Sequence, residues 1–198
     1  PGTGTRVDIG YAEHNAAGFY VSPRYGETAL NDGLTWGVDA FGSIQAALDA
    51  AARALQELRG ALPEGGYSVG VDSGTYVERL VVPSHVRVIG SGADVTAIDA
   101  NNLGSVVTLD AVTDAEVSGF TLRNASAAGA GVEVRNSASG ITIARNIIRN
   151  NASDAVRLSG SSSGVVVFNT IVNNAGSGVY ITEAGTWVEV KNSILDGN

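Results

Sequence analysis

The segment NTIVNN, residues 169–174, places asparagine on both sides of a short apolar run. Asparagine is depleted in strands and favoured in turns, so the segment is typical of a very short strand between two bends. Related segments occur at 146–151 (NIIRNN) and 192–198 (NSILDGN). Their leading asparagines are 23 residues apart (169 − 146 and 192 − 169): Asn146, Asn169 and Asn192. A constant spacing of this length is the signature of a repeat architecture.

Each repeat contains three short strand-like stretches separated by Gly, Ser and Asn. In residues 131–154 these are Val132–Val134, Ile141–Ile143 and Ile147–Ile148. Three strands with their turns make one coil of a three-sided parallel β-helix, in which successive coils pair about 4.8 Å apart. We therefore predict an all-β chain, a single-stranded parallel β-helix of about five coils over residues 66–198.

Stacking of the coils predicts which residues share a row. We expect two inward rows, Val107, Val132, Val156 and Val179 on one face and Leu122, Ile148, Ile171 and Ile194 on another. Asparagine tolerates a left-handed backbone at a bend, and its amide can hydrogen-bond the rungs above and below. Asn146, Asn169 and Asn192 are therefore predicted to form a ladder, with Phe120 in the equivalent slot of the preceding coil. The alternative is that they are ordinary turn asparagines without stacking.

Residues 41–60, FGSIQAALDAAARALQELRG, have the period of an amphipathic helix. Ser43 suits the N-cap and Gly60 suits the terminator. One face carries the apolar side chains Ile44, Ala47, Leu48, Ala51, Leu55 and Leu58. Because the open end of a solenoid has to be closed, we expect this helix to lie across the first coil as an N-terminal cap.

The coil pattern resembles the right-handed parallel β-helix proteins of the pectate-lyase-like superfamily over roughly residues 18–198. The segments that look like the opening of the secreted bacterial members are GFYVSP (18–23), NDG (31–33), FGSIQAALDAA (41–51) and SGTYVERLVVPSHVRVIGSG (73–92). The resemblance implies a right-handed coil and a secreted or extracellular-surface location. TRVDIGYAEH (5–14) is similar to the closing signature of many such proteins. Residues 1–17 are thus interpreted as a linker or the closing strand of a preceding module, with an ordinary N-terminal extension as the alternative, and 18–198 as the β-helix domain.

The net charge of −8 and the pI of about 4.6 argue against a nucleic-acid partner, because nucleic-acid binders usually carry basic patches. The chain has no cysteine, which excludes disulfides and thiolate metal sites. No apolar run approaches the length of a membrane span, so we expect no membrane insertion.

Superfamily enzymes act on acidic polysaccharides, and their motifs do not recur here. The Asn-Thr at 169–170 is followed by Ile171 rather than Asp, and GAGVEVR (129–135) lacks the glutamine of pectin methylesterases. One outward stripe supplies the candidate ligand-binding residues Glu133, Arg135, Asp154, Arg157 and Tyr180. Carboxylates and arginines one rung apart fit an acidic sugar or calcium, and they equally fit cross-strand ion pairs on a solvated face.

Asp32, in ETALNDG (27–33), is a candidate calcium ligand, although the segment lacks the ligand spacing of an EF-hand. We expect no other cofactor and assign no catalytic residue.

Two functions are consistent with this sequence. The first is a non-catalytic structural or adhesive module of a large secreted or surface protein. Such a module would stack end to end with copies of itself or with adjacent β-helix modules, because the last rung exposes unpaired strand edges. The second is a carbohydrate-binding or lyase-like domain acting on acidic polysaccharide.

Overall fold

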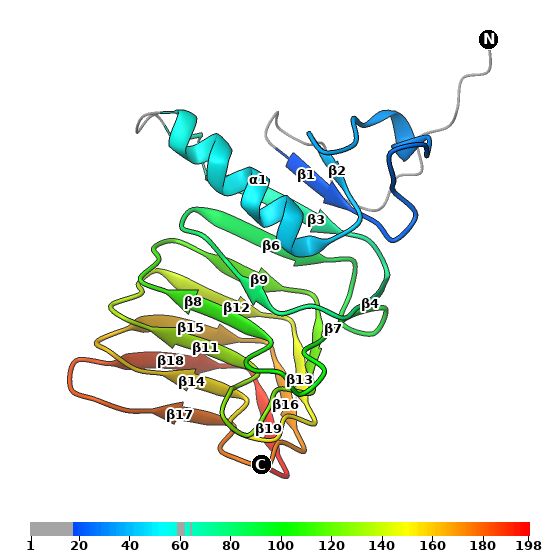
Figure 1. Cartoon of the computed structure of the whole chain (residues 1–198). Coiled ribbons are helices and arrows are strands. Elements are labelled where there is room, and N and C mark those ends of the chain that lie inside the picture. The colour runs from blue at the N-terminus through cyan, green and yellow to red at the C-terminus, as the bar shows by residue number, and fades with distance from the viewer. Residues whose placement is uncertain (1–17, 59–61, 64) are drawn as a thin grey trace.

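The computed structural model describes residues 18–58, 62–63 and 65–198 and shows a parallel β-helix with one α-helix across its N-terminal end (Figure 1). The strands form three parallel sheets, here named A, B and C. Sheet A contains, in spatial order, β18 (Trp187–Lys191), β15 (Ser163–Val167), β12 (Ile141–Ala144), β9 (Glu116–Ser118), β6 (Val86–Gly90), β3 (Tyr67–Val71), β1 (Gly18–Val21) and β2 (Ala40–Phe41). Sheet B contains β19 (Ile194–Asp196), β16 (Thr170–Val172), β13 (Ile147–Arg149), β10 (Thr121–Arg123), β7 (Thr96–Asp99) and β4 (Gly74–Tyr76). Sheet C contains β17 (Val179–Ile181), β14 (Val156–Leu158), β11 (Val132–Arg135), β8 (Val107–Asp110) and β5 (Leu80–Val81).

The helical elements are the 3-10 turn η1 (Asn31–Gly33) and the helix α1 (Ile44–Glu57). Successive strands pass from sheet A to B to C and then begin the next coil. The prediction of a parallel β-helix with one capping helix is confirmed. The solenoid has about seven turns rather than about five, because β1 adds a rung before the first complete coil and β18 and β19 continue beyond the last.

The interior of the solenoid is filled by inward-pointing apolar side chains from all three sheets. Strands alternate between buried and partly exposed positions, as in β11, where Val132 and Val134 are buried and Glu133 is partly exposed. The predicted valine row is confirmed by the register of sheet C, which aligns Val107, Val132, Val156 and Val179. Because every coil repeats this alternation, one continuous core runs along the solenoid axis.

The last coil differs from the prediction by one residue. Ile171 pairs with Leu195, so Leu195 continues the inward row and Ile194 lies outside it. The turn from sheet C to sheet A contains five residues at 182–186, whereas the equivalent turn of the preceding coil contains four at 159–162. Because strand side chains alternate between faces, this one-residue insertion moves Ile194 to the outer face.

A ladder of hydrogen bonds occupies the turn between sheets A and B. The Phe120 N–H donates to Oδ1 of Asn146 (3.0 Å), and the Asn146 N–H donates to Oδ1 of Asn169 (2.9 Å). Each amide group also donates to a carbonyl of the preceding coil, Asn146 to Val117 and Asn169 to Ile143. Both asparagines are buried, so their side chains tie the coils together where no strand does.

Asn192 is not the third member of this ladder. The Asn169 N–H donates to Oγ of Ser193 (3.1 Å), and Asn192 is exposed. The five-residue turn shifts Asn192 into the position of Phe168, where both residues have a left-handed backbone (φ 46° and 57°). Asparagine suits this position because it tolerates positive φ.

A second ladder, at the turn between sheets B and C, consists of Asn151, Asn174 and Asn198. Here the amide groups bond one another directly: Nδ2 of Asn151 donates to Oδ1 of Asn174 (2.8 Å), and Nδ2 of Asn174 donates to Oδ1 of Asn198 (2.7 Å). The last asparagine of each NN or DGN motif carries this ladder, whereas the predicted ladder involves only the leading asparagine.

Helix α1 closes the N-terminal end, as predicted, and lies across the first rungs of sheet A (Figure 1). It begins after the N-cap Ser43, whose Oγ accepts a hydrogen bond from the Ala46 N–H. Ile44, Ala47, Leu48 and Ala51 of the predicted apolar face are buried. The helix ends at Glu57, and the predicted terminator Gly60 lies outside the described residues, as does the whole of 1–17.

Candidate functional site

The outer face of sheet C carries one row of side chains that crosses five rungs. The strand register aligns Val81, Thr108, Glu133, Arg157 and Tyr180. With rungs about 4.8 Å apart, the row extends over roughly 19 Å. Three of the predicted ligand-binding residues therefore stand next to one another in one line.

Arg135 is held by carboxylates on its own strand and on the neighbouring one. Its guanidinium lies 2.8 Å from Oδ2 of Asp110 and 3.6 Å from Oε2 of Glu133. The amide of Asn136 donates to the other oxygen of Asp110 (2.7 Å). The hydrogen bonds from Asn136 and Arg135 lower the pKa of Asp110, because they stabilise its ionised form.

Asp154 and Arg157 form a second ion pair, with Nη2 of Arg157 2.8 Å from Oδ2 of Asp154. Arg157 also donates to Oγ of Ser153 (2.8 Å), and the Ser177 N–H donates to Oδ1 of Asp154 (2.9 Å). Asp154 is thus buried and fully engaged at the loop before β14. Tyr180, on the next rung, keeps 44% of its surface exposed and is free to contact a ligand.

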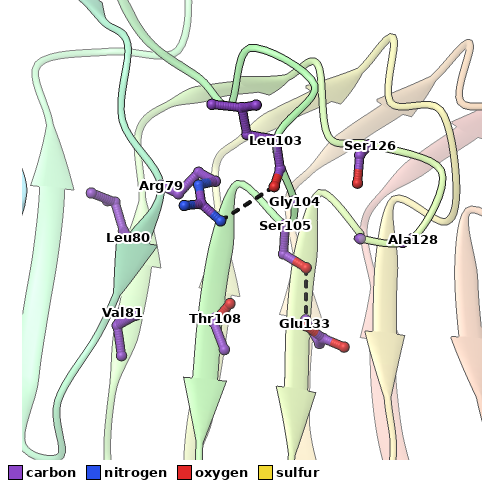
Figure 2. Close-up of a pocket in the computed structure, with 11 residues that line it drawn as sticks. Arg79, Leu80, Val81, Leu103, Gly104, Ser105, Thr108, Ser126, Ala128 and Glu133 are labelled. Carbon is purple, nitrogen blue, oxygen red and sulfur yellow. Dashed lines mark hydrogen bonds between the residues drawn. The ribbon is translucent and has the colours of Figure 1, made fainter.

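A hollow of about 450 Å³ opens at the N-terminal part of this face (Figure 2). Its floor comes from β5, β8 and β11, and its rim comes from the loops that precede β8 and β11. The lining side chains include Arg79, Leu103, Ser105, Thr108 and Glu133. A hollow that combines a cation, a carboxylate and three hydroxyls with apolar side chains has the composition of a small-ligand site.

Arg79 differs from the other arginines of this face because no carboxylate lies within ion-pair distance among the described residues. Nη1 donates to the Leu103 carbonyl oxygen (3.3 Å), which leaves its remaining N–H groups free of described partners. Gly104 allows this placement, since a Cβ there would lie 2.9 Å from Nη1. The guanidinium is therefore positioned by backbone and still able to bind an anion or a hydroxyl.

Glu133 and Ser105 form the polar floor of the hollow. The Ser105 Oγ donates to Oε2 of Glu133 (2.9 Å) and accepts from the Ala130 N–H (3.1 Å). Figure 2 shows Ser105, Thr108 and Glu133 facing the same side as Arg79. These groups can donate and accept hydrogen bonds at the same ligand, which is the requirement for binding a sugar with several hydroxyls.

The structure thus brings Glu133 into the hollow but leaves Arg135 and Asp154 in ion pairs beside it. Arg79 and Ser105 were missed by the sequence reasoning, which began its outward stripe at Thr108. The row pattern did not identify them, because Arg79 precedes β5 and Ser105 precedes β8, outside the paired residues of the two strands.

Asp32 lies in η1 with an exposed side chain, and its Oδ2 accepts a hydrogen bond from the Tyr25 hydroxyl (3.2 Å). Burial, together with the charge of Asp32, raises the pKa of Tyr25 to about 12. Residues 18–58, 62–63 and 65–198 contain no group of three or more His, Cys, Asp or Glu side chains able to hold a metal ion. Calcium binding at Asp32 stays a prediction. Within the same residues, no helix has both the length and the apolar character to cross a membrane.

Comparison with solved structures finds chains of similar fold. A pectin methylesterase mutant in complex with a hexasaccharide is 11% identical, with a TM-score of 0.51, over 87% of this chain and 68% of the other. The pectin methylesterase PemA from Erwinia chrysanthemi is 12% identical over the same shares, with a TM-score of 0.42. The A-module of the mannuronan C-5 epimerase AlgE4 from Azotobacter vinelandii is 19% identical over 69% of this chain and 54% of the other, with a TM-score of 0.33. At these identities the likeness concerns the fold.

No match is found among curated proteins. The family model described as the right handed beta helix region matches residues 84–198, more than half of the sequence. This matched segment contains both asparagine ladders and most of the hollow on sheet C. The chain therefore belongs to the family of right-handed β-helix proteins.

Proposed function

We propose that the chain is a carbohydrate-binding β-helix module that holds a polysaccharide along the outer face of sheet C. The observation that carries this proposal is the hollow lined by Ser105, Thr108, Glu133 and Arg79, whose guanidinium has no ion-pair partner among the described residues. The row continues from the hollow through Arg157 to the exposed ring of Tyr180. An extended chain of sugars can follow such a row, because both the ligand and the rungs repeat along one axis.

The chemistry of the hollow favours a glycan that contains carboxylated sugars. The guanidinium of Arg79 has the planar fork that binds a carboxylate, whereas Glu133 and Ser105 suit hydroxyl groups. A saccharide ligand also agrees with the hexasaccharide complex of the pectin methylesterase that shares this fold. Such a module belongs outside the cell, where acidic polysaccharides are found, which matches the expected secreted or surface location.

Binding to short oligogalacturonate and oligomannuronate chains, measured by isothermal titration calorimetry, tests this proposal. We expect Arg79→Ala to weaken binding about 10- to 100-fold, since a hydrogen bond to a charged group contributes about 1.5–3 kcal/mol. Arg149→Ala is the matched control, because Arg149 lies on sheet B and has no ion-pair partner among the described residues. Equal affinity of the Arg79→Ala variant, or no binding of either glycan by the unaltered chain, would contradict the proposal.

A second candidate function is the structural module that stacks end to end. It is favoured by the last rung, where several large apolar side chains remain exposed: Ile181, Trp187, Val190, Ile194 and Leu195. Among the described residues, strands β17, β18 and β19 each have one edge without a partner strand. The two functions are compatible, since an array of modules would present several binding faces.

A further inference from the structure

A second cavity, of about 440 Å³, lies at the N-terminal cap, away from sheet C. One wall comes from the turn that precedes β2 and from β2 itself, with Trp36 and Phe41. The other wall comes from the start of helix α1, with Ala46, Asp49 and Arg53. This cavity is named the Trp36 groove. None of its lining residues belongs to sheet C or to the hollow at Arg79.

The indole of Trp36 is presented by a turn that the backbone fixes. Trp36 forms an isolated parallel bridge with Ala40, and the Gly37 N–H donates to the Ala40 carbonyl oxygen (2.9 Å). A Cβ at Gly42 would lie 3.3 Å from the indole, so the absence of a side chain at this position leaves space for the ring beside β2. The ring still has 40% of its surface exposed. A large aromatic side chain that is fixed and exposed beside a cavity is suited to stack on a ligand.

The helix side of the Trp36 groove supplies polar groups of both charges. Ala46, Asp49 and Arg53 are spaced three and four residues apart, so they follow one face of α1. Oδ1 of Asp49 accepts a hydrogen bond from Gln45 (2.8 Å), and Arg53 forms neither an ion pair nor a hydrogen bond within the described residues. The small Ala46 leaves space between these two groups and the indole. The groove therefore offers one flat apolar surface, one acceptor and one strong donor.

We propose that the Trp36 groove binds a sugar ring of a neutral oligosaccharide. A pyranose presents a face of C–H bonds that packs on an indole, and hydroxyls at its edge that accept from a guanidinium and donate to a carboxylate. The opposite charges of Asp49 and Arg53 balance, so the ligand has no need of a net charge. A cavity of this size lies in the range of small-molecule sites.

Tryptophan fluorescence can report this binding, because the chain has two tryptophans and the other, Trp187, lies in β18 at the opposite end. In a Trp187→Phe background the emission comes from Trp36. We would titrate neutral hexasaccharides of glucose, xylose, mannose and galactose up to about 10 mM, which covers millimolar affinities. We expect a saturable change in emission with at least one of them. No change with any of the four would overturn the proposal.

Two variants locate the ligand. Gly42→Leu retains Trp36 as the fluorophore but crowds the indole and fills the groove, and its backbone is outside the left-handed region, so the added side chain causes no backbone strain. We expect it to abolish the fluorescence response, whereas Leu30→Ala, a change at a 94% exposed side chain of the same loop, leaves the response intact. Trp36→Ala, followed by calorimetry, is expected to lose at least 10-fold in affinity. Unchanged binding in Trp36→Ala, or in a Gly42→Leu variant with a normal melting temperature, would refute the assignment.

This site is separable from the proposed function on sheet C. Arg79→Ala is expected to leave the Trp36 response unchanged, and Trp36→Ala is expected to leave binding of acidic oligosaccharides unchanged. Loss of the fluorescence response in Arg79→Ala would place the neutral sugar on sheet C and refute the Trp36 groove. Failure of acidic glycans to bind would remove the first proposal while leaving this one to stand on the neutral sugars.

Discussion

At the scale of single residues, each buried asparagine accepts one hydrogen bond and donates another, a combination that no apolar side chain of similar size provides. Each carries both an acceptor and a donor, so one amide satisfies a backbone N–H of the preceding coil and a carbonyl oxygen at the same time. Leucine or valine would fill the same space but remove both of these hydrogen bonds. Buried unpaired groups cost about 1–3 kcal/mol, which makes the ladders specific for asparagine.

Asn169→Ala tests this reasoning. The change removes the acceptor for the Asn146 N–H and the donor to the Ile143 carbonyl oxygen. We expect the free energy of unfolding to fall by about 1–3 kcal/mol. Urea denaturation measures the change, and Asn192→Gly serves as the control.

The control probes an exposed asparagine whose left-handed backbone glycine adopts easily. We expect it to alter stability by no more than about 0.5 kcal/mol. If the free energy of unfolding falls by the same amount in both variants, the hydrogen bonds of Asn169 in the ladder do not contribute to stability.

At the scale of elements, helix α1 is attached to the solenoid by polar side chains as well as by its apolar face. The carboxylate of Glu78, in the segment between β4 and β5, accepts from the Ser43 hydroxyl (2.9 Å) and from the N–H groups of Ile44 and Gln45 (3.0 Å each). A carboxylate at a helix N-terminus is favoured by the unsatisfied N–H groups and by the helix dipole. The Gln45 side chain in turn bonds Val81, where its Oε1 accepts from the N–H (2.9 Å). The Gln45 side chain is thereby hydrogen-bonded to the edge of β5, the first strand of sheet C.

Glu78→Ala is expected to loosen this cap. Loss of three hydrogen bonds to one charged group predicts a decrease of about 1.5–3 kcal/mol in the free energy of unfolding, and faster amide exchange over 44–57. Glu57→Ala is the matched control at the other end of the same helix, where a negative charge is unfavourable, so stability should stay constant or rise slightly. Exchange in α1 that is equal in both variants would mean that the apolar face alone holds the helix.

At the scale of the whole molecule, the two ends of the solenoid differ. The N-terminal end is closed by α1, whose outer side carries exposed Asp49, Arg53 and Gln56. At the opposite end, β17, β18 and β19 surround the inward residues of the last rung, and their outer edges have no partner strand in the part of the chain that the structure describes. Gly18–Val21 have no free edge, since β1 pairs with β2 on one side and β3 on the other. Any stacking of copies must therefore use the last rung against a surface other than β1.

We expect the purified chain to associate with itself in a concentration-dependent manner through the last rung. Covering the exposed Val190 and Leu195 removes apolar surface from water, and pairing the strand edges satisfies their N–H and carbonyl groups. Light scattering should show that Leu195→Lys prevents association, while Val95→Lys, on the loop before β7, has no effect. A chain that is monomeric at all concentrations would argue against stacking.

The sequence by itself determined the solenoid, the capping helix and the inward valine row. In a repeat fold each coil contacts its neighbours, so a local pattern of turns and alternating side chains repeats as the global one. The same logic predicted burial of Ile44, Ala47, Leu48 and Ala51 on α1, because helical periodicity identifies the apolar face without knowledge of its partner.

Only the tertiary structure decided the register of the last coil, the hollow at Arg79 and the Trp36 groove. One additional residue in the turn 182–186 leaves the strand pattern of the sequence unchanged. It nevertheless places Leu195 instead of Ile194 in the inward row, and Ser193 instead of Asn192 in the ladder. The two cavities are formed by loops and a helix whose positions depend on contacts between residues far apart in the chain. Periodicity in the sequence identifies which residues share a row, so the fold could be predicted. Turn lengths and long-range packing determine which side chains meet, so the site could not.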